Sequence, residues 1–224
     1  MNRTFLILFI LGIFGIGAAV AWYLIDSRNQ AFGPIPEKTL PEPSEGSAIY
    51  TNGPHGFTLM YPQSAEVSYE FSPSYNLGTS WRANALPTST GDPLVSILTY
   101  SVSSEDSYPR YFNALVRVGA STSPEELARC EIQTEDAGET ALPDRVINGQ
   151  TWKAFSFEDA AMMQYVRGIS YRTVHEGTCV AMEQVRTGSN YRDDPPSNKD
   201  IPDTTLENEY NALDVIVSSV VFVR

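Results

Sequence analysis

The sequence predicts an α+β domain that follows one N-terminal transmembrane helix. Three observations lead to this prediction: residues 5–25 contain no charged side chain, short runs of alternating apolar and polar residues begin near residue 49, and two later segments carry helix signals. Alternation with a period of two is typical of strands, whereas apolar residues three and four positions apart are typical of helices. We therefore expect three parts, at 1–25, 26–48 and 49–224.

Length and composition fit one folded domain with extensions. The chain has 224 residues, 42% of them hydrophobic, and a formal net charge of −12. A chain with this apolar content can form a sizeable core. The acidic balance argues against nucleic acid as a partner, because nucleic-acid binding uses clustered Lys and Arg to neutralise phosphates.

Residues 5–25 are expected to cross a membrane, since at about 1.5 Å per residue they span the hydrocarbon core of roughly 30 Å. Arg3 precedes this segment and acidic sequence follows it. This charge bias predicts a single-pass membrane protein with a cytoplasmic N-terminus and an extracytoplasmic domain, in the periplasm or at the cell surface. The alternative is secretion after cleavage following Ala21, because residues 19–21 match the small-x-small pattern of signal peptides.

Residues 26–48 are expected to form a stiff, acidic spacer. The segment contains Pro34, Pro36, Pro41 and Pro43. Proline fixes φ and blocks helix, so a chain of this composition favours extended geometry. The spacer would hold the folded domain away from the membrane.

Strands are expected from residue 49 onward. Phe57, Leu59 and Tyr61 alternate with less apolar residues and would share one face, and Pro62 ends the run. His55 lies in the Gly/Pro turn just before this strand, where a surface role is expected. Four further segments have strand-like composition: 66–71, 79–84, 93–103 and 113–121.

Later segments predict two helices and two hairpins. Residues 121–130 carry hydroxyl caps, Pro124 in the first turn and two glutamates near the helix start, so a short helix is expected there. Hairpins are expected to turn at Asn148–Gly149 and Glu176–Gly177. A second helix should begin at a capping box of Thr204 and Glu207, and a strand should close the chain.

Catalytic and metal-binding constellations are not recognisable in the sequence. The two histidines, His55 and His175, do not stand near a nucleophile motif, and His175 is expected to end a strand opposite Thr178. Zinc or iron sites use several Cys or His at close spacing, which the chain does not have. We therefore predict no catalytic residue, no metal site and no cofactor.

Cys130 and Cys179 are the only cysteines. Two cysteines outside the cytoplasm are expected to form a disulfide, which persists in oxidising compartments. Closing a loop of this length would stabilise the fold by about 4 kcal/mol on the chain-entropy model.

One segment combines tyrosine and arginine, the residue types enriched at protein interfaces. Tyr165, Arg167, Tyr171 and Arg172 follow one expected strand and form a candidate interaction surface. Core packing of Tyr165 and Tyr171 is the alternative, because they share a face with Ile169.

The order of these segments resembles the PsbP-like superfamily, which includes the photosystem II extrinsic protein and bacterial membrane-anchored or lipid-anchored relatives. The resemblance covers residues 49–224 and rests on Gly56-Phe57, on Tyr61-Pro62 and on the closing Val221-Phe222. It implies an antiparallel sheet flanked by helices in an α-β-α sandwich. A tryptophan often found shortly after the Tyr-Pro pair is absent, and the expected anchor is a helix rather than a lipid. The resemblance carries over no functional residue.

The function predicted from the sequence is a membrane-anchored extracytoplasmic binding or assembly module rather than an enzyme. Its expected partners are the membrane, through residues 5–25, and a protein. The alternative is an extracytoplasmic hydrolase that uses carboxylates, since the spatial arrangement of Asp and Glu is not visible in a sequence.

Overall fold

The fold is described from a computed structural model, which defines residues 45–74, 77–103, 111–134, 138–189 and 201–223. The chain divides into two units, Met1–Thr39 and Leu40–Arg224. All the described residues belong to the second unit, so the predicted membrane span at 5–25 lies outside them. No helix among the described residues is long and apolar enough to cross a membrane.

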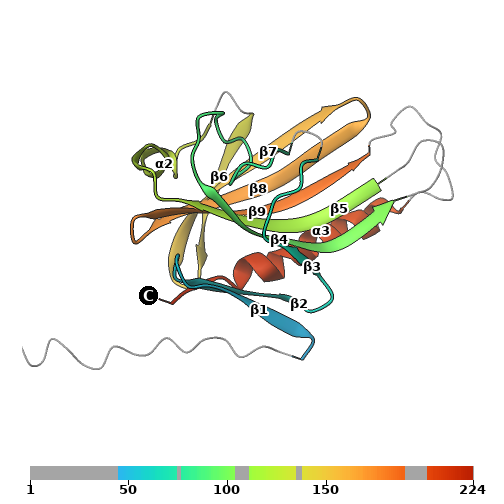
Figure 1. Ribbon diagram of the computed structural model, residues 1–224. Helices are drawn as coiled ribbons and strands as arrows, with labels where there is room; N and C mark the ends of the chain where they lie inside the picture. Colours follow the sequence, from blue (N-terminus) through green and yellow to red (C-terminus); the bar gives the residue numbers. More distant parts are fainter. Residues whose placement is uncertain (1–44, 75–76, 104–110, 135–137, 190–200, 224) are drawn as a thin grey trace, which may run out of the picture. The chain divides into compact units, whose positions relative to one another are not determined.

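The described residues form two antiparallel sheets (Figure 1). A three-stranded sheet has the order β1-β2-β10, and a seven-stranded sheet has the order β3-β4-β5-β9-β8-β7-β6. The strands are β1 Ser47–Asn52, β2 Phe57–Pro62, β3 Glu66–Ser68, β4 Asp92–Ser103, β5 Tyr111–Ser121, β6 Glu139–Ile147, β7 Gln150–Ala161, β8 Gln164–His175, β9 Thr178–Ser189 and β10 Val221–Phe222.

The predicted α+β fold, a helix-flanked α-β-α sandwich, is wrong: the described residues are mostly strand. They include one long helix, α3 (Asp203–Ser218), and one helix of 6 residues, α2 (Pro124–Arg129). Helix α3 lies between the two sheets (Figure 1) and buries Leu213, Ile216 and Val217 in the main core. We call the side of the seven-stranded sheet that packs on α3 its helix face.

An irregular segment, residues 69–74 and 77–91, packs on the opposite face of the seven-stranded sheet. Its Trp81 is buried against Cys130, Cys179 and Ala181. Gly119 of β5 lies directly under this segment, where a Cβ would stand 1.9 Å from the Trp81 carbonyl oxygen. The strand predicted at 79–84 is therefore wrong, because this segment packs across the sheet instead of pairing within it.

Charged side chains are buried on the same opposite face. The Arg117 guanidinium donates to Glu183 at 2.6 Å, and the two side chains are 2% and 1% exposed. A second buried pair joins Arg172 to Glu139. Glu183 also accepts the backbone N–H of Ala83 at 2.5 Å, so it attaches the irregular segment to the sheet. Buried charges need such partners, because desolvation of an unpaired charge is costly.

The predicted disulfide is confirmed. Cys130 follows the last residue of α2 and Cys179 lies near the start of β9, with their Cα atoms 5.7 Å apart. The predicted short helix is also confirmed: the Ser123 hydroxyl caps it by accepting the backbone N–H of Glu126 at 3.2 Å. The disulfide thus connects the end of a capped helix to a central strand of the sheet.

Both predicted hairpin turns are present. Asn148 and Gly149 have φ values of 48° and 84°, and Glu176 and Gly177 have 45° and 74°. Positive φ at both central residues is the geometry that Asn-Gly and similar pairs favour in two-residue turns. The second turn fixes the register of β8 and β9 and places His175 opposite Thr178, as predicted.

Candidate functional site

The structure separates the four residues of the predicted interaction surface. Tyr165 and Arg167 line a groove on the helix face. Tyr171 is on the same face but is 5% exposed and belongs to the main core. Arg172 lies on the opposite face, is 0% exposed and is paired with Glu139. Adjacent residues of a strand point to opposite sides of the sheet, so Tyr171 and Arg172 cannot share one surface.

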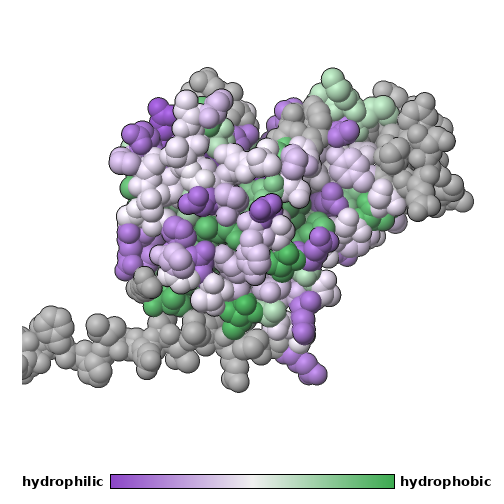
Figure 2. All heavy atoms as spheres, viewed as in Figure 1, coloured by the Kyte–Doolittle hydropathy of each residue, from purple (hydrophilic) through white to green (hydrophobic). Residues whose placement is uncertain are grey.

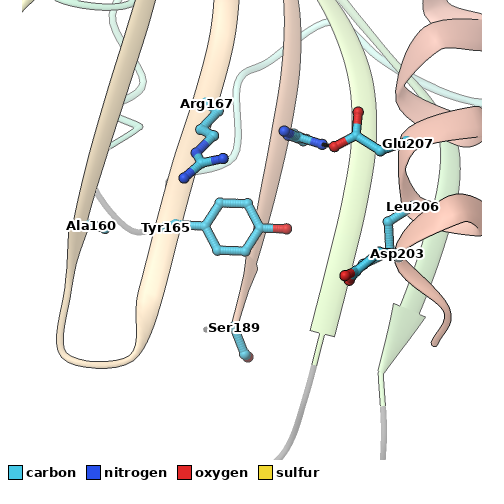
Figure 3. Close-up of a pocket in the computed structure, with 8 residues that line it drawn as sticks. Ala160, Tyr165, Arg167, Ser189, Asp203, Leu206 and Glu207 are labelled. Carbon is cyan, nitrogen blue, oxygen red and sulfur yellow. Dashed lines mark hydrogen bonds and ion pairs between the residues drawn. The ribbon is translucent and has the colours of Figure 1, made fainter. Parts of the chain in front are cut away.

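The groove lies between α3 and one end of the strands β7, β8 and β9 (Figure 3). Its volume is about 490 Å³. Strand β7 contributes Ala160, β8 contributes Tyr165 and Arg167, β9 contributes Arg186 and Ser189, and α3 contributes Asp203, Leu206 and Glu207. We call this set of residues the α3 groove.

A glycine allows the tyrosine to lie across the sheet. Tyr165 of β8 is paired with Gly188 of β9. A Cβ at Gly188 would stand 2.7 Å from the Tyr165 hydroxyl oxygen, so the ring rests over the glycine backbone. In Figure 3 the hydroxyl points across the groove toward α3. A strand glycine often marks such a close approach.

Four charged side chains form a row across the groove. Arg167 of β8 is the cross-strand partner of Arg186 of β9. Arg167 contacts Glu158 at 3.1 Å, and Arg186 contacts Glu207 of α3 at 2.6 Å. The two arginines are therefore neighbours across the β8–β9 pair, and each is bound by a carboxylate on its outer side. Like charges opposite each other repel, and the flanking glutamates offset this repulsion.

The two arginines differ in how firmly they are held. The Arg186 side chain is 15% exposed, and its guanidinium carbon lies 4.9 Å from the centre of the Tyr210 ring. Burial raises the pKa of Tyr210 to about 12. The Arg167 side chain is 44% exposed, and its partner Glu158 is 71% exposed. Exposed ion pairs contribute little to stability, so Arg167 can change partner at small cost.

Tyr165 supplies a hydrogen-bond donor. Burial raises its pKa, although the charges of Arg186 and Arg167 act in the opposite direction. The phenol is therefore protonated at neutral pH, and within the described part of the chain its hydroxyl forms no hydrogen bond. A free phenol beside a half-exposed guanidinium can bind an acceptor-rich group.

The groove continues past the two arginines. A second hollow of about 270 Å³ is also lined by Arg167 and Arg186, together with Ser156, Glu158 and Tyr210 among others. The two hollows therefore adjoin at these two arginines.

The rim of the groove has an exposed apolar tip. The turn between β7 and β8 consists of Met162 and Met163, which are 88% and 49% exposed. Both have positive φ, at 50° and 64°, a conformation that is rare for residues other than glycine. The face drawn in Figure 2 is mostly polar, and its apolar residues are gathered in small separate patches.

Both histidines lie outside the groove. The backbone N–H of His55 donates to the Asn52 side chain at 3.0 Å, within the turn between β1 and β2. The ring of His175 is stacked on Phe222 with the ring centres 3.9 Å apart. The described residues contain no group of three or more His, Cys, Asp or Glu that could hold a metal ion.

Most residues of the groove were not predicted from the sequence. Asp203, Leu206 and Glu207 belong to α3, and nothing local in the sequence brings them to Tyr165. One signal was available: the turn at Glu176–Gly177 sets a register in which Arg167 opposes Arg186. The predicted capping box at Thr204 is not formed, since α3 starts at Asp203 after Pro202 and has no side-chain cap. Glu207 instead binds Arg186.

No protein-family model matches the chain, and a search of curated proteins finds no match. The resemblance to the PsbP-like superfamily therefore stays a prediction.

Proposed function

We propose that the protein is an extracytoplasmic binding module that holds a ligand or a partner segment in the α3 groove. The main supporting observation is the concave polar surface around Arg167 and Tyr165. There a half-exposed guanidinium stands beside a hydroxyl that makes no hydrogen bond to another described residue. Binding sites are typically concave and carry a few polar groups that fix the orientation of the ligand. The opposite wall, formed by Asp203 and Leu206, offers an acceptor and an apolar contact.

The proposed location is outside the cytoplasm, with attachment to the membrane through residues 5–25. The buried disulfide supports this location, since such bonds persist mainly in oxidising compartments. The spacer at 26–48 would then separate the binding module from the membrane surface.

Hydrolysis by carboxylates is the less favoured function. Asp203 and Glu207 lie one turn apart on α3 and both line the groove. However, Glu207 is held by Arg186 at 2.6 Å, so one member of this pair already serves as the counter-charge of an arginine. The arrangement supports ionic binding better than it supports acid-base chemistry.

The location is tested by fusing a reporter after Arg224. A reporter that is active only outside the cytoplasm should be active and should sediment with the membranes. A matched reporter that is active only in the cytoplasm serves as the control and should be silent. The opposite pattern would contradict the proposed location, and a soluble product that begins at Trp22 would instead support cleavage after Ala21.

Binding in the groove is tested by photocrosslinking in native membranes. Placing p-benzoylphenylalanine at Tyr165 should give a defined covalent adduct on illumination, because this ring lies in the groove. The control position is Tyr69, which is 67% exposed and does not line the groove. Equal labelling from both positions, or no adduct from Tyr165, would show that the groove is not the binding surface.

A further inference from the structure

The α3 groove contains a cation that is ready to exchange its partner. Arg167 is bound by Glu158, whose side chain is 71% exposed. An incoming oxyanion would displace this carboxylate into water, where it is fully solvated. Guanidinium groups present a planar fork of donors that matches carboxylate and phosphate in bidentate geometry.

Arg186 reinforces the positive charge beside Arg167. It stands directly across from Arg167 in the β8–β9 ladder and is fixed by Glu207 and by the Tyr210 ring. Its Nε is buried and has no hydrogen-bond partner within the described residues. A fixed cation next to an exchangeable one strengthens the attraction for an anion at the exchangeable position.

Among the described residues, Arg167, Arg186 and Tyr165 place hydrogen-bond donors on the sheet side of the groove. Arginine has no acceptor atom, and the Tyr165 hydroxyl makes no hydrogen bond to another described residue. Asp203, on the α3 side, is an acceptor whose side chain does not cap its own helix. In Figure 3 the Tyr165 hydroxyl and the Asp203 carboxylate face each other across the groove. A complementary ligand therefore has acceptors on one side and donors on the other.

We propose that the α3 groove recognises a ligand through an oxyanion, a carboxylate or a phosphate, which is held by the Arg167 guanidinium and the Tyr165 hydroxyl. Donor groups on the other side of the ligand face Asp203. This inference rests on the proposed binding function and specifies the chemistry of the ligand. Gly188 is a positioning residue, since it makes the space in which the Tyr165 ring lies.

The test uses the full-length chain in detergent, with succinate and inorganic phosphate titrated separately as probes. Chemical shifts of the arginine Nε–Hε groups report binding. At least one probe should bind saturably, and Arg167→Gln should weaken that binding about tenfold or more, as expected for a charge-assisted hydrogen bond. Arg167→Lys keeps the charge but not the fork and should give a smaller loss. The stronger probe identifies carboxylate or phosphate as the preferred oxyanion.

Two controls make the result decisive. Arg129→Gln removes an exposed arginine at the end of α2 and should leave binding unchanged. Tyr165→Phe should weaken binding by a few-fold, since it removes one neutral donor. Equal loss in Arg129→Gln and Arg167→Gln, or no saturable binding of either probe, would overturn the oxyanion inference. If the probes do not bind but the Tyr165 crosslink forms, the oxyanion inference is wrong and the proposed binding function stands. If the probes bind but no crosslink forms in native membranes, the proposed binding function is contradicted and the oxyanion chemistry of the groove stands.

Discussion

Replacing Glu183 with Gln should lower the free energy of unfolding by about 3–5 kcal/mol, the usual cost of removing one partner of a buried ion pair. Glu183 is 1% exposed and accepts from Arg117 at 2.6 Å. The substitution keeps the volume of the side chain and removes its charge, so the Arg117 cation stays buried without its counter-charge. Glu183→Gln also weakens the acceptor for the Ala83 N–H, which attaches the irregular segment to the sheet.

Urea unfolding followed by tryptophan fluorescence measures this loss, because Trp81 is buried in that segment. Asp144→Asn is the matched control: it breaks the exposed pair with Lys153 and should cost less than about 1 kcal/mol. The double variant Arg117→Met with Glu183→Leu should recover most of the stability, since apolar replacement of a buried pair is often neutral. A Glu183→Gln variant as stable as Asp144→Asn would show that the pair is not buried in solution.

Local signals in the sequence predict the elements whose geometry is local. Asn148–Gly149 and Glu176–Gly177 specify two-residue turns by their own conformational preferences, and the structure has both. Ser123 and Pro124 specify the start of α2 in the same way. The β8–β9 register follows from the second turn, so the neighbouring arginines 167 and 186 were predictable from the sequence.

The packing of the irregular segment on the seven-stranded sheet was not predictable from such local signals. Residues 79–84 have the composition of a strand, yet they lie across the seven-stranded sheet. Trp81 packs there on Gly119 of β5, and the Ala83 N–H donates to Glu183 of β9. Tertiary packing of this kind overrides strand propensity. The same holds for the groove, whose α3 wall depends on how the helix packs between the two sheets. The predicted sandwich placed a second helix layer on the opposite face. That prediction failed because packing, and not the periodicity of the sequence, decides what lies on this face.

Removing the disulfide should cost about as much stability as breaking the buried ion pair. The two cysteines are 49 positions apart, and closing a loop of this size removes about 4 kcal/mol of chain entropy from the unfolded state. For a chain of this length, such a loss corresponds to a melting temperature lower by roughly 8–16 °C. The double variant Cys130→Ala with Cys179→Ala, measured by calorimetry, should show this shift.

Ligand binding should not change in the same variant, because the disulfide and the α3 groove are on opposite faces of the seven-stranded sheet. Cys179 packs with Trp81 and Ala181 under the irregular segment, whereas Arg186 of the same strand points to the helix face. A reductant should lower the melting temperature of the natural protein and leave that of the double variant unchanged. Two titratable thiols in unreduced, denatured natural protein would contradict the bond and, with it, the support it gives to a location outside the cytoplasm.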